Sequence, residues 1–343
     1  MGSTRHLGQL ISTGSHEVHS PKLPATWLEK KLGDLESGRV ELKSVFKWFA
    51  IGFGVILGLL ILGVLGFYGL GQARLNKTYE ITSETITIPR DDHALKEGKR
   101  IFQYRGCEAC HGEQLQGLVY LDNPALGLVI TPNLTTGQDG IGSQRTDEDL
   151  VRAIKYGVGP NGTALLFMPS TEFYYLSDED LGQVLAYIRS VPPVENEPGP
   201  SQLSFTGFIV MNFTRDITFL AAELIPHDET PPQAPDPDIS PEYGQYLSIS
   251  CMVCHGATYS GGEIPGFPPE WPAAPNLTSG VGSRLPTWGD EGFIEMIRYG
   301  EKHGRAIQPA YMPWTSYRHM TEDELRAVYA FLMSLPPKGF GNH

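Results

Sequence analysis

The chain has 343 residues, of which 41% are hydrophobic and 19% charged, a composition typical of a folded protein with room for two ordinary domains. Its formal net charge of -13 excludes nucleic acid as a partner, because phosphate recognition requires a basic surface. The charge is uneven along the chain. Residues 1–90 carry ten Lys and Arg against seven Asp and Glu, a net of +3, so the remainder carries -16.

An uncharged apolar segment runs from Phe49 to Leu70. As a helix it is roughly 33 Å long, which spans the hydrocarbon core of a bilayer. A cleaved signal peptide is the competing interpretation, but its apolar core has only about 7–15 residues and follows a short charged start. We therefore predict a single transmembrane helix over residues 46–71 that remains as an anchor in the lipid bilayer.

The basic residues that flank this segment predict its orientation. The N-terminal flank holds Lys30, Lys31, Arg39, Lys43 and Lys47, and the C-terminal flank holds Arg74, Lys77 and Arg90. The positive-inside rule then puts residues 1–45 in the cytoplasm and the chain from about residue 71 onward on the outer side of the cell (inner) membrane, in the periplasm.

The outer portion contains an internal repeat. Cys107 and Cys251 differ by 144 positions, as do Met168 and Met312, and the text PNLT occurs in both halves. We predict two copies of one small domain, at residues 72–193 and 241–343. The linker over residues 194–240 is rich in Pro, Glu and Asp at both edges.

The linker has an apolar middle, LSFTGFIVMNFTRDITFLAAELI, which resembles a second membrane span. The charges of Arg215, Asp216 and Glu223 are too costly for that assignment. We expect this segment to pack against the domains or against a partner subunit.

Helix-start signals predict a mainly α fold for both domains. A short helix over about residues 93–104 precedes the first cysteines. The run from Thr146 to Asp149 is a helix-start signal, and Ser177 with Asp180 resembles a capping box, each before an apolar helical pattern. Little in either domain has the pattern of a strand.

All four cysteines of the chain lie in two copies of the motif Cys-x-x-Cys-His. The copies are Cys107, Cys110 and His111, and Cys251, Cys254 and His255. Two thiols and an imidazole at this spacing serve a redox dithiol, a zinc site or the attachment of haem c. A dithiol of the thioredoxin type needs a strand and crossover helix, and zinc needs four ligands, whereas residues 112–226 hold no Cys or His. Two copies in register favour two covalently bound haem c groups.

The second axial ligand follows by elimination. The first domain contains one methionine, Met168, and no second histidine, and only Met312 has the corresponding position in the second domain. Each methionine follows its motif histidine by 57 residues and precedes a proline. Histidine with methionine closes the coordination of the iron and raises its potential, which favours electron transfer over catalysis. The alternative for each is a methionine that fills the core.

Two prolines are candidates for orienting the histidines. A ligating imidazole usually donates its other N–H to a carbonyl, and Pro132 and Pro275 have matching positions in the repeat. The alternative is that both prolines only shape the loop.

These motifs resemble class I c-type cytochromes, specifically membrane-anchored di-haem cytochromes c of bacterial respiratory or photosynthetic electron-transfer complexes. ITPNLT…GIG…TDEDLVRAIKYGV and LSDEDLGQVLAYIRSVPPV look especially like cytochrome subunits of quinoprotein and flavoprotein dehydrogenases. Those subunits often carry three haems and a C-terminal anchor, whereas we expect two haems, an N-terminal anchor and a cytoplasmic tail here. The family's first-helix pattern, Gly98 then Phe102, fits the first domain better, because Gly244 lies two residues closer to its cysteine.

The resemblance implies an N-terminal transmembrane helix followed by two tandem class I cytochrome c domains, and an electron-transfer subunit that is no enzyme by itself. We expect it to carry electrons from a quinol-oxidising membrane complex, cytochrome bc-like or alternative, to a soluble carrier or terminal oxidase. The first alternative is the electron-outlet cytochrome of a periplasmic quinoprotein or flavoprotein dehydrogenase. The alternative of another class is a di-haem peroxidase, against which Met168 and Met312 argue.

Overall fold

A computed structural model of the chain describes residues 25–81, 85–214, 217–229, 231–267, 269–302 and 304–341. Residues 1–24 of the predicted cytoplasmic segment, and Arg215 and Asp216 of the linker, lie outside the described residues. The chain divides into two compact units, Met1–Val64 and Leu65–His343. Both haem motifs belong to the second unit.

The first helix, α1 (Ala25–Leu75), begins before the predicted span and continues beyond it. The extension follows from the sequence EKKLGDLE, because Leu, Glu and Lys are good helix formers. Within the part of the chain that the structure describes, α1 is the one helix long and apolar enough, by length and composition, to cross a membrane.

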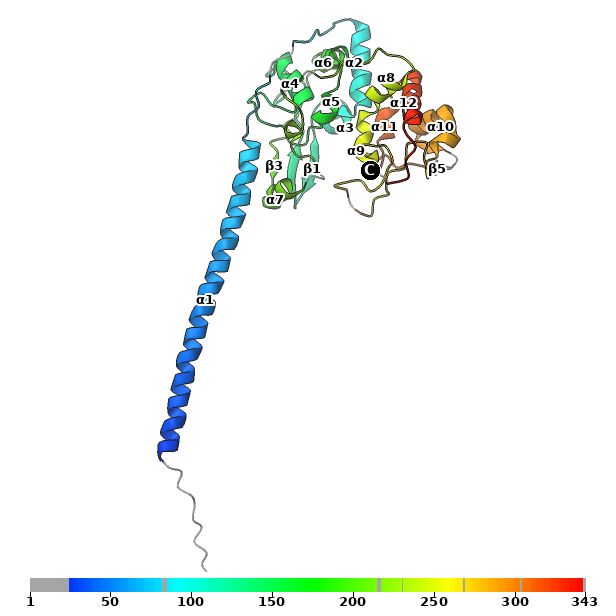
Figure 1. The fold of residues 1–343 in the computed structure, drawn as a ribbon. Coiled ribbons are helices and arrows are strands. Elements are labelled where there is room, and N and C mark those ends of the chain that lie inside the picture. The colour runs from blue at the N-terminus through cyan, green and yellow to red at the C-terminus, as the bar shows by residue number, and fades with distance from the viewer. Residues whose placement is uncertain are drawn as a thin grey trace, which may run out of the picture. The chain divides into compact units, whose positions relative to one another are not determined.

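Each repeat builds the same order of helices (Figure 1). The first repeat consists of α2 (Asp92–Tyr104), α3 (Cys107–His111), α4 (Asp147–Tyr156), α5 (Ser170–Phe173) and α6 (Asp178–Ser190). The second consists of α8 (Pro241–Leu247), the 3-10 turn η2 (Ile249–Cys251), α9 (Met252–His255), α10 (Leu285–Tyr299), α11 (Trp314–Tyr317) and α12 (Glu322–Ser334). The prediction of a mainly helical fold is confirmed.

The first and last helices of each repeat cross at a glycine. A Cβ atom on Gly98 of α2 would lie 1.9 Å from the Gln183 carbonyl oxygen of α6, and one on Gly244 of α8 would lie 2.0 Å from that of Ala327 in α12. Gly244 therefore makes the same crossing as Gly98, despite its shorter distance to the motif. Between Gly244 and Cys251 the chain is two residues shorter than between Gly98 and Cys107. The shorter path is possible because α8 ends at Leu247 and the 3-10 turn η2 leads directly into Cys251.

Little of the described chain is strand, as expected, and three of the strands form a small antiparallel sheet that begins after α3. Its strands are β1 (Val119–Asn123), β2 (Gly127–Ile130) and β3 (Gln202–Leu203), in the order β1-β2-β3, and the second repeat has the two-residue strands β4 (Glu301–Lys302) and β5 (Arg305–Ala306). Strands of two to five residues are too short to show a period of two in the sequence.

The segment predicted as a linker contributes to the core of the Leu65–His343 unit. Besides β3, it forms α7 (Phe205–Phe213) and the 3-10 turn η1 (Ala221–Glu223). Phe208 and Met211 of α7 form a buried cluster with Phe219 and Leu220 of the same segment. Leu126 and Phe167 of the first repeat pack against this cluster. The expectation that this segment packs against the domains agrees with these contacts.

The two predicted helix starts are capped differently in the structure. Thr146 and Asp149 form the complete box, with both side chains bonded to the opposite backbone N–H. At α6 the Ser177 hydroxyl accepts from the Asp180 N–H at 3.0 Å. The Asp180 carboxylate instead accepts a hydrogen bond from the hydroxyl of Tyr246, a residue of the second repeat, so only half of this box forms.

Replacement of the crossing glycine tests the close approach of the helices. Gly98→Ala raises helix propensity by about 1 kcal/mol, but the new methyl group overlaps the Gln183 carbonyl. We expect the free energy of unfolding to fall by about 1–3 kcal/mol, because overpacking outweighs propensity. Denaturant unfolding should show this loss, with the neighbouring exposed Lys99→Ala as a control that changes little. A Gly98→Ala variant more stable than the parent would contradict the crossing.

Candidate functional site

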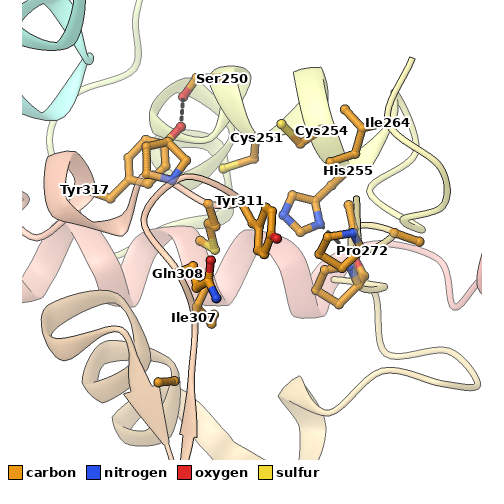
Figure 2. Close-up of a pocket in the computed structure, with 16 residues that line it drawn as sticks. Ser250, Cys251, Cys254, His255, Ile264, Pro272, Ile307, Gln308, Tyr311 and Tyr317 are labelled. Atoms are coloured by element: carbon orange, nitrogen blue, oxygen red, sulfur yellow. Dashed lines mark hydrogen bonds between the residues drawn. The ribbon is translucent and has the colours of Figure 1, made fainter. Parts of the chain in front are cut away.

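Each Cys-x-x-Cys-His motif occupies a helical turn directly after the first helix of its repeat. The first motif forms α3, and the second is shared between η2 and α9. All four cysteines are half-buried free thiols. Figure 2 shows Cys251, Cys254 and His255 around one cavity, with the ring of Tyr311 close to the imidazole of His255.

The two motif histidines are buried and have the same hydrogen-bond partner. The Nδ1 atom of His111 lies 3.2 Å from the Pro132 carbonyl oxygen, and that of His255 lies 2.8 Å from the Pro275 carbonyl oxygen. Because a carbonyl oxygen only accepts, Nδ1 carries the hydrogen and Nε2 keeps its lone pair. Burial lowers the pKa of both imidazoles, more than the carbonyl contact raises it. Both rings are therefore neutral, as a metal ligand must be.

The loops that supply these carbonyls are held by a buried Asn and Thr of the repeated PNLT text. The Asn133 side-chain oxygen accepts from the backbone N–H of Thr135 at 3.0 Å and from its hydroxyl at 2.8 Å. The Asn133 amide donates to the carbonyl of Val194 at 2.7 Å. The same bonds recur in the second repeat, where they join Asn276, Thr278 and the carbonyl of Lys338. The sequence did not predict that the Asn and Thr of PNLT hold the loop. The recurrence of two polar residues in both loops was the signal of this hydrogen-bonding role.

The two predicted methionines lie in turns of the same shape. The backbone N–H of Ser170 donates to the Met168 carbonyl at 2.8 Å, and Trp314 makes the same bond to Met312 at 2.8 Å. The proline after each methionine then caps a short helix, with ψ near 50° in both copies. The two repeats therefore share the backbone geometry of this turn as well as its sequence.

Each repeat gathers its two cysteines, its histidine and its methionine around one cavity. The cavity of the first repeat holds about 70 Å³ and is also lined by Phe102, Leu134, Phe173, Val184 and Arg105. The cavity of the second repeat is wider, at about 340 Å³, and is also lined by Ile264, Pro272, Ile307, Tyr311 and Tyr317. The lining is mostly apolar in both, as in sites that bind a flat organic cofactor.

The donors present fit haem c better than a redox dithiol or zinc. Burial raises the pKa of Cys107 and of Cys251 to about 12, whereas a reactive dithiol needs a lowered pKa. No cluster of three or more His, Cys, Asp or Glu side chains suited to a metal ion occurs among the described residues. Two thiols, a neutral imidazole and an apolar cleft are what covalent haem attachment requires.

The two repeats pack directly on one another. Buried residues from both repeats form one continuous apolar cluster, which runs from Ile101 in α2 to Leu332 in α12. Arg100 of α2 donates to both carboxylate oxygens of Glu324 at 2.6 and 2.8 Å. Only 6% of the Glu324 side chain is exposed, so this ion pair is largely shielded from water.

A second contact between the repeats surrounds Arg105, two residues before the first motif. Its guanidinium lies 5.2 Å from the ring of Tyr104 and 4.9 Å from that of Tyr246 in the second repeat. The side chain is buried, and its Nε and Nη2 atoms have no hydrogen-bond partner among the described residues. Arg105 is thus a buried positive charge that lines the first cavity and faces the second repeat.

Comparison with known proteins decides the family. Residues 95–192 and 242–336 match the family model of cytochrome c, and together they make up more than half of the chain. The chain belongs to the cytochrome c family. Haem c is therefore its cofactor, and the prediction of two tandem cytochrome c domains agrees with the two matches.

Curated relatives of this cytochrome include subunits of dehydrogenases. The chain is 26% identical over 279 residues to the cytochrome c subunit of alcohol dehydrogenase (quinone) from Gluconobacter oxydans, which covers 73% of this chain and 56% of the relative. It is 27% identical to the fructose dehydrogenase cytochrome subunit of Gluconobacter japonicus, over 74% of this chain and 55% of the relative. A diheme cytochrome c-type protein of Cereibacter sphaeroides is 29% identical over 146 residues, which cover 39% of this chain and 49% of that protein.

The comparisons bear on the predicted function in two ways. The expectation of an electron-transfer cytochrome c agrees with the family, and the relatives are named as cytochrome subunits. The named dehydrogenases support the alternative, an electron outlet for a dehydrogenase, better than the leading expectation of a quinol-oxidising complex. The chain spans about half the length of the first two relatives.

The ion pair between the repeats can be tested by stability. Arg100→Gln leaves the shielded Glu324 carboxylate without its partner, and we expect a loss of about 1–3 kcal/mol in the free energy of unfolding. Glu97→Gln is the matched control, since Glu97 also binds Arg100 but is 30% exposed and should matter less. Thermal unfolding of the two variants measures the difference, and equal effects would contradict the assignment.

The half-buried carboxyl of Glu172, in α5, predicts a dependence of stability on pH. Burial raises its pKa to about 7, partly offset by Arg105. A carboxyl with a raised pKa in the folded state stabilises the fold below its unfolded pKa, and that contribution is lost as the pH rises through about 7. Glu172→Gln should thus gain about 1–3 kcal/mol relative to the parent between pH 4.5 and pH 8.

Urea unfolding at both pH values measures this gain. Glu179→Gln, which removes an exposed carboxyl from the nearby α6, serves as the control. If the free energy of unfolding changed by the same amount in the parent and in Glu172→Gln between the two pH values, the raised pKa would be refuted.

Proposed function

We propose that this cytochrome is the membrane-anchored electron-outlet subunit of a periplasmic dehydrogenase of the quinoprotein or flavoprotein class, and that it carries two haem c groups. The observation that carries the proposal is the similarity of both repeats to cytochrome subunits of such dehydrogenases. The partner is then a dehydrogenase subunit on the donor side and a soluble electron carrier or a terminal oxidase on the acceptor side.

In this proposal each repeat holds one haem by four side chains. Cys107 and Cys110 would tether the first haem, and Cys251 and Cys254 the second. His111 with Met168 would bind the first iron, and His255 with Met312 the second. The shared cavities and the matching methionine turns support this assignment. When bound, the haem supplies one-electron oxidation and reduction at iron.

The protein side chains prepare these sites in three ways. The carbonyls of Pro132 and Pro275 fix each imidazole with Nε2 free, so that no proton must leave when iron binds. The apolar lining excludes water from the iron and favours the reduced state. The ligand pair of histidine and thioether leaves no position for a substrate, which argues against a di-haem peroxidase.

The proposed anchor is α1, with residues 46–71 in the cell membrane, residues 1–45 in the cytoplasm, and the haem domains at residues 72–193 and 241–343 in the periplasm. The hydropathy of α1 and the basic flank before it support this topology. The interdomain segment 194–240 then belongs structurally with the first haem domain, because α7 and β3 pack there.

Electrons would pass between the two sites inside one protein. The continuous apolar cluster and the Arg100–Glu324 pair hold the two repeats together, so the transfer needs no diffusional encounter. The buried charge of Arg105 lies along the shared interface and favours the presence of an electron on either side of it.

Replacement of the methionines tests the axial ligands. Met168→Ala and Met312→Ala should each lower one midpoint potential by on the order of 100 mV and remove half of the far-red absorption of methionine-ligated ferric haem, because a thioether favours Fe(II). Met320→Leu is the control, since Met320 is a buried methionine of the second repeat that does not line the cavity. Spectroelectrochemical titration measures the potentials, and unchanged potentials would exclude these ligands.

Isolation of the native complex tests the parent enzyme. Affinity purification of the tagged full chain from membranes should recover a subunit that contains a flavin or a quinone cofactor, identified by mass spectrometry. Recovery of quinol-oxidising subunits without a dehydrogenase would instead support the cytochrome bc-like complex. A tag on a chain that lacks both motif histidines controls for capture that depends on an intact cytochrome.

A further inference from the structure

A short helix of the interdomain segment packs against the end of α1. The side-chain amide of Asn212 in α7 donates to the carbonyl of Phe67 at 3.0 Å. The rings of Tyr68 and Phe208 lie 5.0 Å apart. At Gly71 the two helices approach so closely that a Cβ atom would lie 2.6 Å from the Phe208 ring.

An ion pair locks this contact. Arg74, one turn after Gly71, binds both carboxylate oxygens of Glu223, the last residue of η1, at 3.0 and 2.6 Å. The same guanidinium donates to the Met211 carbonyl in the last turn of α7. The C-terminal end of α7 is therefore attached to α1 by charge as well as by packing.

The outward face of α7 is apolar and exposed. Gly207, Phe208 and Met211 are buried on the inner face, whereas Phe205 is 49% and Phe213 is 66% exposed. Residues four apart share a helix face, so Phe205, Ile209 and Phe213 form one stripe, which we call the α7 stripe. The helix contains no charged residue. The polar residues of α7 are Thr206 and Asn212, which lie at the margins of the α7 stripe.

The continuity of the α7 stripe with the predicted membrane span identifies what covers it. Phe67 and Tyr68, which contact α7, are themselves in the uncharged segment Phe49–Leu70. Leu65 and Leu70 of the same stretch are 59% and 58% exposed. The basic residues resume only beyond this point, at Arg74, as they do at the level of lipid headgroups. A helix packed at the last turn of a span lies at the depth of the interface.

We propose that α7 is a second membrane contact, whose Phe205, Ile209 and Phe213 enter the outer interface of the lipid bilayer beside the end of α1. The proposal rests on the proposed function in one respect, the anchoring of α1 in the membrane. An apolar face next to the headgroup region is the arrangement of interfacial helices.

The consequence reaches the first haem site. The inner face of α7 packs on Phe219, whose ring lies 4.8 Å from that of Phe167, the residue before Met168. The membrane contact is thus one layer of side chains from the methionine turn. Two attachments, α1 and α7, restrict the tilt of the haem domains more than a single helix does.

Site-directed spin labelling of the full, haem-loaded chain in phosphatidylethanolamine and phosphatidylglycerol vesicles tests the proposal. Phe205→Cys and Phe213→Cys each introduce one cysteine for the label, while the parent chain measures the background from its own cysteines. Collision of the label with oxygen, which concentrates in lipid, is compared with collision with a water-soluble nickel chelate. The haems are kept reduced so that they do not broaden the signal.

Two control positions separate this proposal from the anchor itself. Leu60→Cys lies in α1 within the predicted span, and Val281→Cys is 86% exposed in the second repeat. We expect a several-fold higher ratio of oxygen to nickel collisions at positions 205 and 213 than at 281, and a still higher ratio at 60. A high ratio at 60 with water-like ratios at 205 and 213 would overturn the membrane contact of α7 alone. A water-like ratio at 60 would overturn the anchor, and the α7 contact with it.

Discussion

The direct packing of the two repeats is the constraint on which the rest of this cytochrome depends. Arg100 and Glu324 form a two-bond ion pair across the interface, and Tyr246 crosses from the second repeat to bond with Asp180 of the first. The apolar cluster beneath them is continuous. Because of this interface, the two repeats pack as one body, and we propose that they act as one electron-transfer unit.

Within each repeat, the haem site is assembled from segments that are far apart in the sequence. The helix crossing at Gly98 or Gly244 positions the cysteine motif, and the Asn and Thr of PNLT hold the loop whose carbonyl orients the histidine. The proline turn then places the methionine along the same cavity. The glycine crossing, the Asn and Thr hydrogen bonds and the proline turn each occur in both repeats. The two repeats therefore share local geometry as well as sequence.

The parts of the fold and the site that the sequence predicted are those with a strong local signal. The helices were predictable from caps and apolar periodicity, and the cavity residues from two motifs and a methionine in register. The sheet was missed because strands of two to five residues carry too little periodicity. Half of the Ser177 box was wrong because Asp180 has a tertiary partner, Tyr246, which no local pattern reveals. Arg105 gave no signal, since its burial depends entirely on the packing of the two repeats.

The central claim, that the two haem sites work as one unit, is tested most directly by the kinetics of a single electron. A laser-generated reductant delivers less than one electron per molecule to the purified protein, and absorbance follows its redistribution between the two haems. The structure predicts a redistribution rate that does not change with protein concentration and a phase that disappears in Cys251→Ala with Cys254→Ala. A rate proportional to protein concentration would show transfer between molecules and contradict the claim.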